Sequence, residues 1–349
     1  MAGSMFLSAW SLSLVLCSIV VLFLMANAAR TGVRVLRYWD QASDSNLQIS
    51  LENETWLAST LIEFALAVQG LSLLLFILAA DSYSQVIAGA MCATGSLLAN
   101  EFGLPTLYLK LAGFFLYGFW ILLHQIDIRS EVYPLVRVKY LYLLLLLPFI
   151  LADILFQTLY IANLDPDIIT SCCAVVFSDA TGEGGNLLGS LPQDLMLWLY
   201  YGTIVVLLGL ALLMNNRIPG LMLAGKKVQS ILSFLYAMGW LWFFGLALAV
   251  ITAVISSYIY AMPFHRCPFC IIKQDYCYIG LAIYFTLICG TFFGISTALA
   301  ELLARRPELA GPVRQYRKIA IDLSLILLII LAVLSSYHYL LYMITGGES

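Results

Sequence analysis

Two cysteines in the second half of the chain have the spacing best suited to chemistry. They lie between two long apolar runs, in the segment His265-Arg266-Cys267-Pro268-Phe269-Cys270-Ile271-Ile272-Lys273. A Cys-x-x-Cys pair can cycle between two thiols and a disulfide, and its thiolates can bind soft metals. The flanking cations, and the start of a helix predicted over 276–302, would favour the thiolate form. The spacing therefore predicts a redox-active pair, a metal site or a structural disulfide.

A second pair of thiols is adjacent in sequence. Cys172 and Cys173 lie in the loop 163–194. Neighbouring cysteines rarely bond each other, so we expect separate disulfide partners or a soft metal such as Cu(I) or Hg(II). The candidate partners for such disulfides are Cys92, Cys267 and Cys277.

The histidines offer a third ligand type. His265 beside Cys267 and Cys270 would suit Zn or Cu, with a fourth ligand supplied from elsewhere. The alternative for His265 is a contact with solvent or lipid headgroups. A haem with two histidine ligands is disfavoured, because only His265 and His338 are expected at one membrane depth.

The elements that must position these residues are membrane helices. The 349-residue chain is 62% hydrophobic and 11% charged, with a mean hydropathy of +0.95. A spanning helix needs about 20 apolar residues. We predict an all-α protein with one integral membrane domain over 1–349. Its eight spans are 5–29, 57–80, 104–123, 140–162, 195–214, 229–260, 276–302 and 319–343.

Basic residues orient these spans. The loops 124–139, 215–228 and 303–318 are rich in Lys and Arg, so we expect them in the cytoplasm. The loops 163–194 and 261–275 then lie outside, as do both termini, and a bacterial plasma membrane is the expected location.

A ninth span over 83–100 is the alternative to this arrangement. It would place the Arg residues that follow the first span outside, against the charge bias. We therefore prefer 83–103 as a re-entrant or surface segment, buried in protein or lining a cavity.

Ionisable side chains also fall inside the predicted spans. Glu63, Lys110, Asp153 and Gln157 are the intramembrane polar candidates. Such groups are rare in lipid and are usually paired or functional. We predict that Lys110 pairs with Glu63 or Asp153. A structural ion pair, a proton or ion pathway and a polar substrate cavity all remain open.

Aromatic residues gather at the span ends, where we predict an interfacial belt. The belt candidates are Trp56, Trp120, Trp198, Tyr200, Tyr201, Tyr258, Tyr260, Tyr337, Tyr339 and Tyr342. We find no internal sequence repeat, and no basic run interleaved with aromatics that would indicate nucleic-acid binding.

The run from Cys267 to Lys273, followed by Cys277 and Gly280, resembles the disulfide-generating membrane oxidases of the DsbB type. The position of the pair beside a membrane helix is also similar to that in the vitamin K epoxide reductases. The resemblance implies that Cys267 and Cys270 form a pair beside a bound quinone. Lys273 would contact the quinone, with Arg266 and His265 as further candidate contacts. Cys172 and Cys173 would then be the shuttle pair.

The resemblance is local. Those families have a core of four or five helices and a second pair whose cysteines are spaced apart, so no whole-chain match follows.

Three functions are therefore open. The leading hypothesis is thiol-disulfide or quinone-linked electron transfer at a non-cytoplasmic site. The alternatives are binding or transport of Cu, Zn or Hg, and a non-catalytic anchor subunit of a larger complex. The expected partners are the lipid bilayer and either a secreted or periplasmic thiol protein or other membrane subunits.

Overall fold

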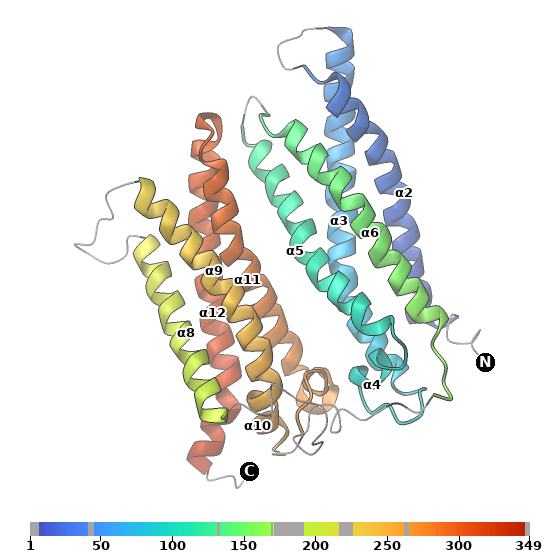
Figure 1. Ribbon diagram of the computed structural model, residues 1–349, viewed down its shortest axis with the longest axis vertical. Helices are drawn as coiled ribbons and strands as arrows, with labels where there is room; N and C mark the ends of the chain where they lie inside the picture. Colours follow the sequence, from blue (N-terminus) through green and yellow to red (C-terminus); the bar gives the residue numbers. More distant parts are fainter. Residues whose placement is uncertain are drawn as a thin grey trace. The chain divides into compact units, whose positions relative to one another are not determined.

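A computed structural model describes residues 7–40, 45–130, 133–168, 170, 192–215, 226–261 and 265–345. Within these ranges the regular structure is helical and no strand is present. The chain divides into two compact units, Met1–Thr170 and Ser171–Ser349. Figure 1 shows the helices of both units.

The first unit is a bundle of four long helices. They are α2 (Ala9–Tyr38), α3 (Asn46–Tyr83), α5 (Gly103–Asp127) and α6 (Val136–Ala162). Helix α3 packs on α2 and α5, and α6 closes the ring by packing on α5 and α2. Ser8 and Ser45 cap the first two helices by accepting from backbone N–H groups three residues on. The result is an up-and-down bundle with a buried apolar core.

A short helix, α4 (Ala93–Leu97), follows α3 and precedes α5. The Ser96 hydroxyl donates to the Ala80 carbonyl at 2.5 Å, and the Tyr160 hydroxyl donates to the Ser96 carbonyl at 3.1 Å. A Cβ on Gly103 would lie 2.2 Å from the Leu97 carbonyl oxygen, so only glycine allows α5 to begin there. All five α4 residues are buried in protein, and five residues cannot span a bilayer. The ninth span is therefore excluded.

The second unit is also a ring of four long helices. Its long helices are α8 (Gln193–Met214), α9 (Lys226–Val250), α11 (Ile279–Leu303) and α12 (Ala310–Thr345). Helix α9 packs on α8 and α11, and α12 packs on α11 and α8. Trp240 fills the hollow left by two glycines of α11, because a Cβ on Gly294 would lie 2.1 Å from its ring and one on Gly290 would lie 2.8 Å away.

Helix α9 does not end as an ordinary α-helix. Its last turns continue as a π-helix, η1 (Ile251–Ile255), and then as α10 (Ser256–Tyr260). Between α10 and α11 lie two 3-10 turns, η2 (Cys270–Ile272) and η3 (Gln274–Tyr276), and a third, η4 (Pro307–Leu309), precedes α12. The turns η2 and η3 belong to the segment that carries the Cys-x-x-Cys pair.

The prediction of eight spans is confirmed: eight helices of the described residues are long and apolar enough to cross a membrane. The chain is an integral membrane protein in architecture, and its outer apolar side chains would contact lipid. The predicted aromatic belt is consistent with Trp56 and Trp198, which are 73% and 79% exposed. It is wrong for Trp120, Tyr200 and Tyr260, which are buried because they pack inside their own units.

Candidate thiol site

The Cys-x-x-Cys segment is a compact cap between α10 and α11. Ala261 ends α10 in the left-handed conformation, at φ 53°. After Lys273, η3 leads into Cys277 and Tyr278, which are both left-handed, at φ 52° and 55°. These two residues turn the chain into α11.

Helix α11 begins at Ile279, three residues later than the sequence predicted. Cys270 instead opens its own 3-10 turn, η2, and Cys267 precedes that turn. The pair is therefore not in the first turn of α11. The predicted stabilisation of thiolate by the N-terminus of that helix does not apply, because the effect falls off within one turn.

The cap is seated directly on α11. A Cβ on Gly280 would lie 2.6 Å from Cγ1 of Ile271 and 2.8 Å from its carbonyl carbon and oxygen. The absence of a side chain at Gly280 lets the backbone of η2 touch the first turn of the helix. Ile271 and Ile272 are buried in this contact, so the position of the two cysteines is fixed by close packing.

The two sulfur atoms lie within 4.8 Å of each other. Cys267 is fully buried and Cys270 is 7% exposed. A disulfide requires about 2.05 Å between sulfurs, whereas two thiolates on one tetrahedral zinc ion, with bonds of about 2.3 Å, lie about 3.8 Å apart. Among the six cysteines that the structure describes, no two are joined by a disulfide. The geometry suits a dithiol that can close on itself or hold a soft metal.

Three tyrosines surround the pair, and sequence reasoning missed all of them as site residues. The Tyr260 hydroxyl donates to the Cys267 carbonyl at 2.5 Å, and the Tyr284 hydroxyl donates to the Pro268 carbonyl at 2.7 Å. The Tyr276 ring packs edge-on against Tyr260, with centroids 4.8 Å apart. The backbone between the two cysteines is thus held from both neighbouring helices.

The surroundings of Tyr276 also change the pKa of its phenol. Partial burial, followed by the neighbouring Cys270 sulfur and the Asp275 carboxylate, raises the pKa of its phenol above the ordinary value. The phenol therefore stays protonated at neutral and mildly alkaline pH, and it stays a hydrogen-bond donor beside the thiols.

The π-helix explains how Tyr260 reaches this position. A π-turn inserts one residue into the helical register, and such turns are frequent at functional sites. All five residues of η1 are buried, so the irregularity lies in the core of the unit. The turn sets the direction in which α10 presents Tyr260. In the sequence, 251–260 is a plain apolar continuation of the span, which is why the signal was missed.

The residues that flank the pair have separate roles. His265 packs its ring edge-on against Tyr260 at 4.7 Å, and it does not complete a three-ligand cluster with the two sulfurs. The Lys273 backbone N–H donates to the Cys270 carbonyl at 3.1 Å, and its side chain is half-buried. Arg266 is also half-buried. Arg266 directly precedes Cys267, and Lys273 lies three residues after Cys270.

The remaining cysteines are distributed as follows. Cys92 is the buried N-cap residue of α4 in the first unit. Cys277 is exposed at the left-handed turn before α11. Cys172 and Cys173 lie outside the described residues, and so does any contact they make.

The predicted intramembrane polar residues form two clusters in the first unit. In the first cluster, Lys110 Nζ lies 3.2 Å from Asp153 Oδ1, and both side chains are fully buried. Gln69 donates to the other Asp153 oxygen at 2.6 Å, and Lys110 donates to the Ser72 hydroxyl at 3.0 Å. One turn along α6, Gln157 donates to Ser18 at 3.0 Å. Of the two partners predicted for Lys110, the structure selects Asp153.

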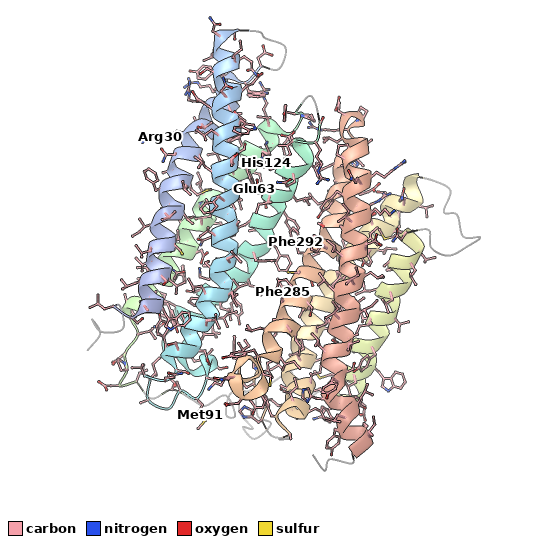
Figure 2. All side chains as sticks on the ribbon, turned by 180° about the vertical axis from the view of Figure 1, so that it is seen from behind. Arg30, Glu63, Met91, His124, Phe285 and Phe292 are labelled. Carbon is pink, nitrogen blue, oxygen red and sulfur yellow. The ribbon has the colours of Figure 1, made fainter. Side chains whose placement is uncertain are left out.

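Glu63 belongs to the second cluster (Figure 2). It accepts from Gln125 at 2.6 Å and lies 3.8 Å from His124 Nε2. On the other side of the imidazole, Lys139 Nζ lies 3.2 Å from Nδ1 and 2.8 Å from Asp127. An ammonium only donates, so Nδ1 must accept and Nε2 carries the hydrogen that faces Glu63. His124 and Lys139 also line a cavity of about 430 Å³.

No family model, curated protein or solved structure matches the chain. The functional argument therefore depends on the geometry of the site.

Proposed function

We propose that this membrane protein transfers electron pairs between thiols and a lipid-soluble acceptor through Cys267 and Cys270. The observation that carries the proposal is the buried pair of sulfurs within 4.8 Å, held in a cap with tyrosine hydrogen bonds on both sides. A pair at this distance needs only a small rearrangement to form a disulfide. The local sequence resemblance to quinone-linked thiol oxidases supports the same chemistry.

The reaction balances with a quinone as acceptor. Oxidation of two thiols forms one sulfur-sulfur bond and releases two protons and two electrons. A quinone takes up both to become a quinol. Arg266 and Lys273 would stabilise a thiolate or a quinone anion through their positive charge. A thiol protein on the same side would then reduce the disulfide, and Cys172 and Cys173 are the proposed relay.

Topology supports an outer location. With eight spans, the segments 84–102, 163–192 and 261–278 all leave the membrane on one face by chain parity. The opposite face then carries every Lys and Arg of the chain except Lys110, Arg266 and Lys273. The excess of positive charge marks that opposite face as cytoplasmic. In a bacterial plasma membrane the thiols would therefore face an oxidising compartment.

Thiol trapping of the full-length protein in detergent tests this function. After reduction, and again after addition of a water-soluble quinone, free thiols are alkylated and mapped by mass spectrometry. We expect Cys267 and Cys270 to change together from alkylated to disulfide-bonded, with one quinone reduced per protein.

The matched variants are Cys267→Ser and Cys289→Ser. The first should abolish quinone reduction, whereas the second removes a thiol inside α11 and should leave it unchanged. A pair that stays alkylated with quinone present, or a Cys267→Ser protein with full activity, contradicts the proposal.

Soft-metal binding is the second candidate, because the sulfur spacing also fits two thiolates on one ion. Purification under reducing conditions with Cu(I) or Zn(II), followed by elemental analysis, distinguishes the two functions. One metal ion per chain that is lost in Cys267→Ser, with no quinone reduction, favours the metal site. Normal behaviour of every cysteine variant in both assays favours the anchor-subunit hypothesis.

A further inference from the structure

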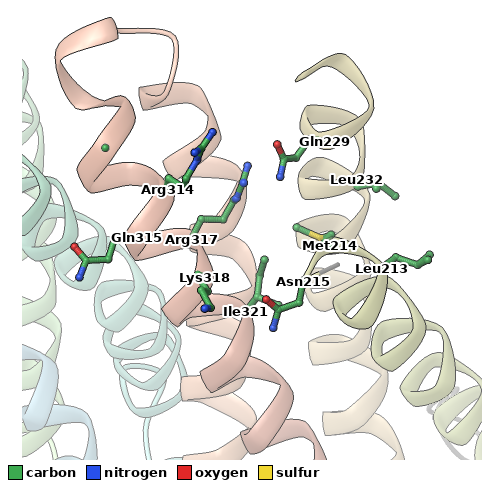
Figure 3. Close-up of a pocket in the computed structure, with 11 residues that line it drawn as sticks. Leu213, Met214, Asn215, Gln229, Leu232, Arg314, Gln315, Arg317, Lys318 and Ile321 are labelled. Carbon is green, nitrogen blue, oxygen red and sulfur yellow. The ribbon is translucent and has the colours of Figure 1, made fainter. Parts of the chain in front are cut away.

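A basic pocket lies in the second unit, at the end of the bundle opposite the thiol cap. It has a volume of about 670 Å³ and lies among the end of α8, the start of α9 and the start of α12. Figure 3 shows Arg314, Arg317 and Lys318 on α12 at one side of the pocket, with Gln229 and Leu232 on α9 at the other. Nothing in the thiol chemistry requires this pocket.

The three cations are not equivalent. Arg317 donates to the Glu301 carboxylate at 2.8 Å, so its charge is compensated. Arg314 and Lys318 are one helical turn apart and exposed, and they make no ion pair with any residue that the structure describes. A neighbouring cavity of about 430 Å³ shares Arg314 and Arg317 and adds Arg305. Among the residues that the structure describes, the pocket thus has two cations, Arg314 and Lys318, that take part in no ion pair.

The walls of the pocket are partly apolar. The aliphatic lining is Leu213, Met214, Leu232 and Ile321, and the amide groups of Asn215, Gln229 and Gln315 complete it. Just beyond the pocket, α9 presents Ile231 and Leu235 to the outside, 58% and 53% exposed. If an amphipathic molecule entered from the bilayer, its apolar chains would contact the apolar walls and its polar head would contact the cations.

We propose that this pocket binds the phosphate headgroup of an anionic glycerophospholipid. An Arg guanidinium and a Lys ammonium one turn apart can share the oxygens of one phosphodiester, the arginine through two parallel N–H donors. Basic pockets between membrane helices on the cytoplasmic side recognise such headgroups. The charge bias of the loops assigns this end of the bundle to that side. Apolar walls beside the cations favour a lipid over free phosphate.

Lipid titration of the full-length protein in neutral detergent tests the site. Native mass spectrometry counts bound phosphatidylglycerol, phosphatidylcholine and inorganic phosphate in parallel arms. We expect phosphatidylglycerol to bind and phosphatidylcholine to bind much more weakly. The double variant Arg314→Gln, Lys318→Gln should weaken phosphatidylglycerol binding about 25-fold, since each cation near a membrane surface contributes about fivefold.

The matched control is Arg30→Gln, which removes one exposed cation from α2 in the other unit and lines no part of this pocket. It should bind phosphatidylglycerol like the original protein. Equal binding of the two lipids, or an unchanged affinity in the double variant, overturns the proposal. Inorganic phosphate that binds alone and displaces the lipid completely would show that the site takes free phosphate instead. Because both substituted side chains are exposed, an unchanged melting temperature is expected and separates lost binding from lost folding.

Discussion

Lys110 and Asp153 show how single residues shape the first unit. Both side chains are fully buried between helices, where an isolated charge would be strongly unfavourable. Gln69 donates to one Asp153 oxygen, the Lys110 ammonium donates to Ser72, and the same ammonium lies 3.2 Å from the other Asp153 oxygen. Such an arrangement contributes little net stability over apolar residues, but the loss of one partner leaves an uncompensated buried charge.

Lys110→Met should therefore destabilise the protein by about 3–5 kcal/mol, because the Asp153 carboxylate loses its counter-charge. The measurement is the free energy of unfolding in detergent, followed through the change in helical circular dichroism. The double variant Lys110→Met, Asp153→Leu should recover most of the loss. If the single variant is as stable as the original protein, the pair is not a constraint on the fold.

Sequence reasoning predicted that Lys110 would need a partner but not which one. Glu63 and Asp153 are both single acids within predicted spans. The choice depends on the rotation of α3 and α6 about their axes, which apolar periodicity defines poorly when helices are hydrophobic on all sides. Glu63 points instead to Gln125 and His124.

At the scale of elements, the thiol cap depends on one close contact between η2 and α11. Gly280 permits that contact, since any Cβ there would overlap Ile271. The contact sets where Cys267 and Cys270 lie relative to Tyr260 and Tyr284. Displacement of the cap would expose the sulfurs while the four long helices stay packed.

Gly280→Ala should accordingly increase the rate at which a maleimide labels Cys267 by about tenfold or more, because the strained cap opens more often. Gly209→Ala in α8 is the matched control, as no atom lies within 4 Å of its added Cβ. The control should leave labelling unchanged and the helix equal or slightly more stable. Equal labelling in both variants would show that the contact does not hold the cap closed.

The long helices could be predicted from apolar runs alone, and the cap could not. A run of about 20 apolar residues has one stable form in lipid. The 3-10 turns, the left-handed Cys277 and Tyr278 and the π-turn of η1 have no such signature. They depend on packing between Ile271 and Gly280 and on hydrogen bonds from Tyr260 and Tyr284 to the backbone of the cap. The sequence therefore predicts an interfacial position for Tyr260.

For the whole molecule, the number of spans decides which segments share a face. Eight spans place the connections after α3 and α10 on one side and those after α5 and α11 on the other. The proposed orientation puts the second side in the cytoplasm, because the basic residues that follow α11 and begin α12 lie there.

Reporter insertions after Gln85 and Gln274 should therefore read as outside the cytoplasm, and insertions after Ile128 and Arg306 as inside it. The assay compares an alkaline phosphatase fusion, active outside, with a fluorescent protein, bright inside. The same side for Gln85 and Ile128 would contradict the eight-span topology, because it would require α5 not to cross.

The two rings of four helices share a feature at the start of their third helix. In each unit the second long helix is followed by a short cysteine-bearing segment, and the first turn of the third long helix contains a Gly-Leu pair, Gly103-Leu104 in α5 and Gly280-Leu281 in α11. A backbone carbonyl of the cysteine-bearing segment lies against each of these glycines. A module with four spans starts and finishes on the same side of a membrane. Tandem duplication of its gene would therefore insert the second copy upright rather than inverted. Each copy would then put its cysteine-bearing segment on the same side of the membrane.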